Sequence, residues 1–186
     1  MSGRNGRAGR ILVLAMGNDL LSDDGAALHA SRLLRWIAPD HVDVVETSEA
    51  GFALLEFLEG YPRALILDAI RTGKHAPGTL MQLTQEDFAP IESPSPHYAG
   101  LPDLRALADQ SGISFPDEVL MLAMEVRDPY SIGEELTPEV SMALQDYVRA
   151  AADILMRWPR NGSLLHEHQP AAGRADRGSE RNDIAS

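Results

Sequence analysis

The chain has 186 residues, 44% of them hydrophobic, and a formal net charge of −12, which suits one domain with a buried core and tails. It has no cysteine, which excludes disulfide scaffolds, thiol nucleophiles and Cys-ligated zinc sites. The acidic balance argues against nucleic-acid or anionic-membrane partners, and no apolar stretch approaches the roughly 20 residues that span a bilayer. We therefore expect a cytoplasmic protein with no nucleic-acid or membrane partner.

The first predicted elements are a strand, a loop and a helix. An unbroken apolar run over residues 11–16 is typical of a strand buried on both faces, and predicts a first strand over residues 10–16. Gly17 ends this run, and two adjacent acids, Asp23 and Asp24, follow it. Apolar residues then recur at helical spacing, which predicts a helix over residues 24–37. The loop therefore carries acids at the carboxyl end of a strand, where ligands gather in open α/β sheets.

Further strands and helices alternate along the chain. Strands are predicted over residues 42–46, 64–70, 78–83 and 118–126, and helices over residues 50–58, 96–110 and 138–158. Alternation implies parallel pairing with right-handed crossovers. We predict an α/β fold, namely a three-layer α/β/α domain with a mostly parallel five-stranded sheet over residues 10–158. Residues 1–9 are predicted to be a flexible leader and residues 159–186, polar and poor in large apolar groups, a disordered tail.

Three residues that are far apart in the sequence are predicted to meet at one edge of this sheet. Asp24 follows the first strand, Asp68 ends the third, and His97 opens the helix over residues 96–110. Two carboxylates and an imidazole suit a borderline divalent ion such as nickel or zinc, with coordination positions left for exchange. A helix N-terminus also disfavours protonated imidazole, which keeps His97 available as a ligand.

Each of these residues also has a purely structural interpretation. Asp23 is better explained as a helix cap than as a ligand. For Asp24, a first-turn acid that complements the helix dipole and a ligand are equally good interpretations. Asp68 needs a partner if it is buried, but it can also cap the turn that follows its strand. His97 can be a solvated first-turn histidine. The spacing of the residues does not decide between these alternatives and a metal site.

Five segments together resemble the hydrogenase maturation proteases. They are GNDLLSDDG after the first strand, LDAI ending the third, APGTL opening the fourth, SPHYAGL before the next helix and IGEELTPEV before the last. The similarity runs in order through residues 10–158. It implies an endopeptidase, classed with the aspartic-type peptidases, that removes a C-terminal extension from a nickel–iron hydrogenase large-subunit precursor. By position it implies that Asp24, Asp68 and His97 bind nickel supplied by the precursor, with Asp24 and Asp68 as the catalytic carboxylates. We expect the protein to act as a monomer.

The loop after the second strand departs from the pattern of this family. The family often has an acid, paired glycines and a threonine there, whereas this chain reads ETSEAG over residues 46–51. This departure leaves open a second hypothesis, a non-catalytic checkpoint protein that binds nickel and the precursor during hydrogenase assembly. A catalytic dyad of two aspartates that share one proton is disfavoured, because it gives His97 no role. A dinucleotide-binding site is disfavoured because the G-x-G-x-x-G motif is absent.

Overall fold

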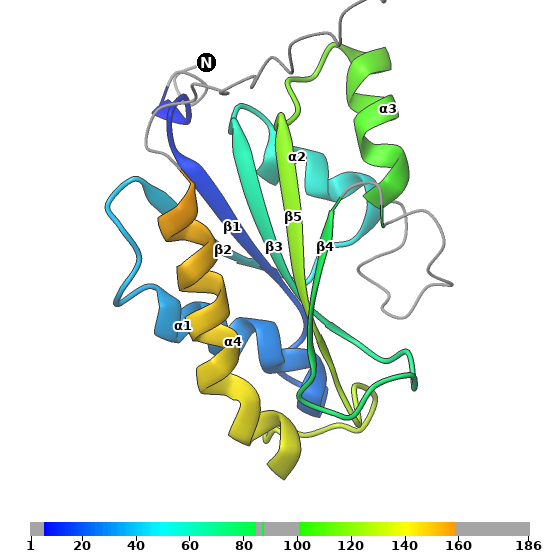
Figure 1. Ribbon diagram of the computed structural model, residues 1–186. Coiled ribbons are helices and arrows are strands. Elements are labelled where there is room, and N and C mark those ends of the chain that lie inside the picture. The colour runs from blue at the N-terminus through cyan, green and yellow to red at the C-terminus, as the bar shows by residue number, and fades with distance from the viewer. Residues whose placement is uncertain (1–5, 85–86, 88–100, 159–186) are drawn as a thin grey trace, which may run out of the picture.

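The apolar runs form the middle of a five-stranded sheet (Figure 1). The structure is a computed structural model, which describes residues 6–84, 87 and 101–158. The strands are β1 (Ile11–Met16), β2 (Val42–Thr47), β3 (Arg63–Ile70), β4 (Leu80–Thr84) and β5 (Glu118–Glu125). They lie in the order β2-β1-β3-β5-β4, and only β4 runs antiparallel to its neighbour. The predicted five-stranded, mostly parallel sheet is confirmed.

Helices cover both faces of this sheet and make three layers. They are the 3₁₀ turn η2 (Ser22–Gly25), α1 (Ala26–Leu34), the 3₁₀ turn η3 (Gly51–Leu54), α2 (Leu55–Leu58), α3 (Leu101–Ser111) and α4 (Pro138–Arg157). The helices α1 and α4 pack together on one face, and α2 and α3 lie on the other (Figure 1). The predicted α/β/α architecture is therefore confirmed.

Strand β1 supplies both halves of the hydrophobic core, because successive side chains of a strand point to opposite faces. Ile11, Val13 and Ala15 pack in the cluster that contains α1 and α4. The alternate residues of β1 pack in the cluster that contains α2 and α3. All six residues are buried, as the unbroken apolar run predicts. The central strands therefore form a rigid platform, and their carboxyl ends meet at its lower edge in Figure 1.

The first helix differs from the prediction. The segment predicted as one helix over residues 24–37 is a 3₁₀ turn followed by α1, which ends at Leu34. The nitrogens of Trp36 and Ile37 donate to the carbonyl oxygens three residues before them, at 3.2 and 3.0 Å, so the chain tightens before Pro39. As a result, the Ile37 side chain is exposed rather than part of the buried face.

Several predictions fall partly outside the described residues. The predicted start of the third long helix, with His97, lies there, as do residues 1–5 and 159–186 of the predicted leader and tail. Within the described residues, no helix is both long enough and apolar enough to cross a membrane.

Candidate active site at the carboxyl edge of the sheet

The turn that carries Asp24 lies against the strand that carries Asp68. Asp24 belongs to η2, which follows β1, and η2 packs against β3. Asp68 is the sixth residue of β3, and both acids are buried. The Oδ1 atom of Asp68 accepts a hydrogen bond from the backbone nitrogen of Ala69 at 2.9 Å. The structure therefore brings two of the three predicted ligands to one edge of the sheet.

A close approach of the backbone fixes where η2 leaves β1. A Cβ atom on Gly17 would lie 2.2 Å from the backbone oxygen of Asp24, far inside van der Waals contact. The nitrogen of Gly17 donates to the carbonyl oxygen of Thr47 at 3.1 Å, which joins this turn to the end of β2. Only glycine allows the chain to double back this tightly. Gly17 therefore sets the position of the Asp24 backbone.

Asp23 does not cap the first helix, so that prediction is wrong. Neither η2 nor α1 has a side-chain cap. The Oδ2 atom of Asp23 instead accepts hydrogen bonds from the backbone nitrogens of Arg127 and Asp128, at 3.1 and 2.9 Å. Its Oδ1 atom accepts from the nitrogen of Thr137 at 2.7 Å, and Oδ2 also accepts from the Thr137 hydroxyl at 2.9 Å. The buried carboxylate of Asp23 thus ties η2 to the loop between β5 and α4.

Thr137 is the residue before α4 and Pro138 is the first residue of that helix, as predicted. The Thr137 hydroxyl, however, donates to the carboxylate of Asp23 and makes no capping hydrogen bond to the helix. The same loop runs beside η2 in a short parallel pairing of Leu21 with Gly133. The nitrogen of Ser22 donates to the carbonyl oxygen of Gly133 at 2.6 Å. The turn that carries Asp24 is therefore held by the loop after β5 as well as by β1.

A buried tyrosine supports the strand that carries Asp68 from the α4 side. The hydroxyl of Tyr147 lies 3.0 Å from the backbone oxygen of Asp68 and 2.8 Å from that of Leu122 on β5. Burial, together with the nearby Asp68 carboxylate, raises the pKa of the Tyr147 hydroxyl well above its usual range. The hydroxyl therefore stays protonated, and its proton is shared between carbonyl oxygens of two neighbouring strands.

Glu125, the last residue of β5, is another buried acid at this edge. Its Oε1 atom accepts from the backbone nitrogens of Thr72 and Gly73, at 2.9 and 2.7 Å. Its Oε2 atom accepts from the Thr72 hydroxyl at 2.5 Å. Glu125 thus holds the loop that follows Asp68. The sequence carried a signal for this residue, because an acid that ends an apolar strand needs a partner when it is buried.

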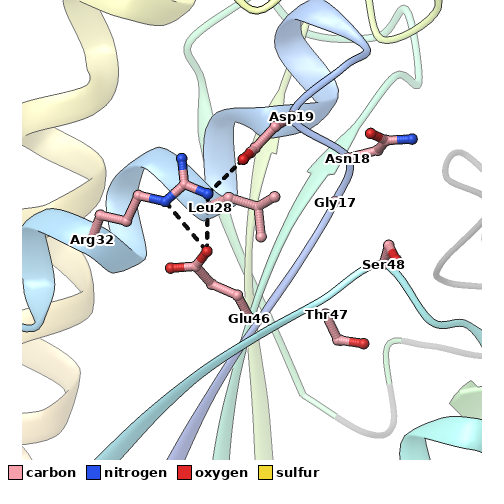
Figure 2. A pocket seen from close by; sticks show the side chains of 8 residues that line it. All are labelled: Gly17, Asn18, Asp19, Leu28, Arg32, Glu46, Thr47 and Ser48. Atoms are coloured by element: carbon pink, nitrogen blue, oxygen red, sulfur yellow. Dashed lines mark hydrogen bonds and ion pairs between the residues drawn. The ribbon is translucent and has the colours of Figure 1, made fainter.

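A hollow of about 300 Å³ opens beside the turn after β1. Its lining comprises Gly17, Asn18, Asp19, Leu28, Arg32, Glu46, Thr47 and Ser48. Figure 2 shows the Arg32 guanidinium between two carboxylates, donating to Asp19 Oδ2 at 2.5 Å and to Glu46 Oε2 at 3.0 Å. Glu46 Oε1 also accepts from the Ser31 hydroxyl at 2.9 Å. The acid of the divergent loop therefore points toward α1.

His97, the third predicted ligand, lies outside the described residues. Among the residues that the structure does describe, no group of three or more His, Asp or Glu side chains is arranged to hold a metal ion. Chemically, the described part of the site offers two buried carboxylates. Carboxylate oxygens are ligands that divalent cations accept.

Comparison with known proteins agrees with this architecture. The model of the HycI family, described as hydrogenase maturation protease, matches residues 29–154, a span that includes Asp68 and His97 and begins after Asp24. The hydrogenase 2 maturation protease of Escherichia coli K12 is 34% identical over 142 residues, which are 73% of this chain and 84% of that protein. The hydrogenase expression/formation protein HupD of Bradyrhizobium diazoefficiens is 30% identical over 80% of this chain and 79% of its own length.

Solved structures give the same result. The hydrogenase maturating endopeptidase HybD from Escherichia coli aligns with a TM-score of 0.68 and 29% identity, over 79% of this chain and 92% of that one. The [NiFe] hydrogenase maturation protease HybD from Thermococcus kodakarensis aligns with a TM-score of 0.63 and 30% identity, over 78% and 99%. With a family match over more than half of its residues and a relative at 34% identity over 73% of them, the chain belongs to the hydrogenase maturation protease family.

Proposed function

We propose that this protein is an endopeptidase that removes the C-terminal extension of a nickel-loaded hydrogenase large-subunit precursor. Asp24, Asp68 and His97 complete the coordination of the nickel that the precursor brings. Nickel is thus part of the substrate. The protein recognises a loaded precursor because its own residues and those of the precursor bind the same nickel ion. The protein acts in the cytoplasm, as a monomer.

The observation that carries this proposal is the buried pair of acids at the carboxyl edge of the sheet. Asp68 lies two residues before the end of a central strand, and the turn with Asp24 packs against that strand. Two carboxylates and an imidazole form a donor set that borderline divalent ions accept. In a chain of this family, that donor set supports metal-dependent recognition of the precursor.

The protein's own residues have two tasks in this reaction. Asp24 and Asp68 hold the loaded precursor by its metal, and the hydrogen bonds of Asp23 and Tyr147 keep the two acids in place. Bound nickel would supply Lewis-acid chemistry, either by polarising the scissile carbonyl or by lowering the pKa of a water. Binding that fixes the metal next to the scissile bond lowers the entropic part of the barrier.

The test is cleavage of purified nickel-loaded precursor by Asp68→Asn and His97→Ala. Each variant is expected to lose about 100-fold or more in kcat/KM, the range for the loss of a group at the reacting centre. Asp146→Asn is the matched control, because Asp146 is an exposed acid on α4 paired with Arg149. Unimpaired cleavage by both site variants removes the proposal.

A second candidate is a checkpoint protein that binds nickel and the precursor without cleaving it. The divergent loop favours it, because Thr47 accepts from the Gly17 nitrogen through its carbonyl oxygen and so contacts the turn that leads to Asp24. The hydroxyl oxygen of Thr47 also accepts from the nitrogen of Glu49 at 3.0 Å. Binding of loaded precursor by the wild-type protein, with no product formed over many hours, would select this candidate.

A further inference from the structure

Two large apolar side chains project into solvent beside the candidate active site. Ile132 is 91% exposed and Leu20 is 59% exposed. Leu20 lies in the loop after β1, four residues before Asp24, and Ile132 lies in the loop after β5. Both loops lie at the carboxyl edge of the sheet (Figure 1). Single exposed apolar residues are common on protein surfaces, and what distinguishes these two is the way the backbone holds them.

Backbone pairing holds these two loops side by side. The nitrogen of Gly133, the residue after Ile132, donates to the carbonyl oxygen of Leu20 at 3.0 Å. The Ser22 nitrogen donates to the Gly133 carbonyl oxygen, and the Ser22 hydroxyl donates to the carbonyl oxygen of Glu135 at 2.9 Å. The Asp23 carboxylate accepts hydrogen bonds from Asp128 near the start and from Thr137 at the end of the loop between β5 and α4. Leu20 and Ile132 therefore lie on two loops that hydrogen bonds hold together. These bonds restrain the loops from moving the two side chains into the protein interior.

Two acidic residues come shortly after Ile132 in the same loop. Glu134 and Glu135 lie two and three residues after Ile132, and both are exposed. We use the name Leu20–Ile132 surface for the side chains of Leu20, Ile132, Glu134 and Glu135. An apolar centre with an acidic rim is complementary to an apolar hollow with a basic rim.

We propose that the Leu20–Ile132 surface is the docking surface for the folded body of the protein substrate, whose matching surface is an apolar hollow with basic residues around it. This inference rests on the proposed function. An isoleucine that is 91% exposed is a projecting group, and only a folded partner with a hollow can enclose it on several sides. Because the surface adjoins the turn that carries Asp24, docking there brings the extension of the substrate close to the acids. The docking contacts are made equally before and during cleavage, so their binding energy lowers KM and leaves kcat unchanged.

The first test compares the double variant Leu20→Ser/Ile132→Ser with Trp36→Ser. Trp36 is a matched control, because it is 89% exposed and lies just beyond the C-terminal end of α1, whereas Asp24 lies just before the N-terminal end of that helix. With nickel-loaded precursor, the double variant is expected to raise KM by about 10-fold or more, while kcat at saturation is unchanged. Trp36→Ser is expected to change neither constant. Both exchanges are at exposed positions, so the urea midpoint of unfolding should stay at the wild-type value.

An unchanged KM for the double variant overturns this inference while the wild-type protein still cleaves, which leaves the proposed function intact. An equal rise in KM for Trp36→Ser also overturns it, because the effect would then come from surface hydrophobicity in general. Failure of the wild-type protein to cleave loaded precursor would overturn the proposed function instead.

Competition separates the body of the substrate from its extension. A mature large subunit that lacks the extension is expected to inhibit cleavage by the wild-type protein, and to inhibit the double variant about 10-fold less well. No inhibition of the wild-type protein would mean that the extension alone is recognised, which overturns the inference. A Glu134→Lys/Glu135→Lys variant is expected to slow association with the precursor most at low salt, because rim charges act mainly on the rate of encounter.

Discussion

The carboxylate of Asp23 lies 2.7 Å from the backbone nitrogen and 2.9 Å from the hydroxyl oxygen of Thr137, the residue that precedes α4. Together with the backbone nitrogens of Arg127 and Asp128, these donors surround a side chain that has no exposed surface. Both oxygens of the carboxylate face an N–H group. This relationship explains why an acid is required at position 23, and it makes the turn that carries Asp24 dependent on the loop after β5.

Asp23→Asn is therefore expected to be strongly destabilising although it is nearly isosteric. In the better orientation of the amide, its oxygen replaces Oδ2, and its NH2 group then faces the N–H of Thr137. The opposite orientation places the NH2 group against two backbone N–H groups. A buried donor without an acceptor costs about 1–3 kcal/mol, so the free energy of unfolding in urea should fall by about that amount. A loss below about 0.5 kcal/mol would contradict this account of Asp23.

Glu125→Gln is expected to be tolerated, which makes it the matched comparison for the change at Asp23. Both N–H donors of the loop, from Thr72 and Gly73, point at Oε1, which the amide oxygen can replace. The NH2 group then lies at the place of Oε2 and donates to the Thr72 hydroxyl, which can turn to accept. The free energy of unfolding should change by less than about 1 kcal/mol. Equal losses for Glu125→Gln and Asp23→Asn would show that charge, not the pattern of donors, decides both sites.

Gly17→Ala is expected to destabilise the chain and to slow cleavage, because the new Cβ atom would lie 2.2 Å from the Asp24 backbone oxygen. Relief of this clash must move the turn that carries Asp24. We expect a loss of about 2–4 kcal/mol in the free energy of unfolding and a fall in kcat for the precursor. Gly112→Ala is the control, because Gly112 has a φ of +66° and its new methyl group would meet nothing within 4 Å. It should lose only about 1 kcal/mol, the cost of the backbone conformation alone.

The sequence predicted the elements of this fold better than the contacts between its loops. Unbroken apolar runs identify buried strands, and Asp68 stood out because it is an acid near the end of one of them. The same local signal occurs at Glu125, where the acid holds a loop. The hydrogen-bond partners of Asp23 are 104 to 114 residues away in the sequence, so no local sequence pattern could predict them. A helix cap was the simplest explanation from the neighbouring residues alone. Acids at strand ends can thus be located from the sequence, but their roles depend on distant donors.

The alkaline limit of stability is expected to depend on Tyr147. Its pKa is raised in the folded chain by burial and by the Asp68 carboxylate, so the unfolded chain loses this proton first as the pH passes about 10. The folded state then binds more protons than the unfolded state, and stability falls as the pH rises above about 10. Tyr147→Phe should make this alkaline decline shallower, although about 1 kcal/mol of stability is lost at neutral pH with the hydroxyl. The pKa of Tyr61 is also raised, so the decline is reduced rather than abolished. Urea midpoints measured from pH 8 upward, with the exposed Tyr130→Phe as control, check this: equal alkaline slopes in wild type and Tyr147→Phe would contradict it.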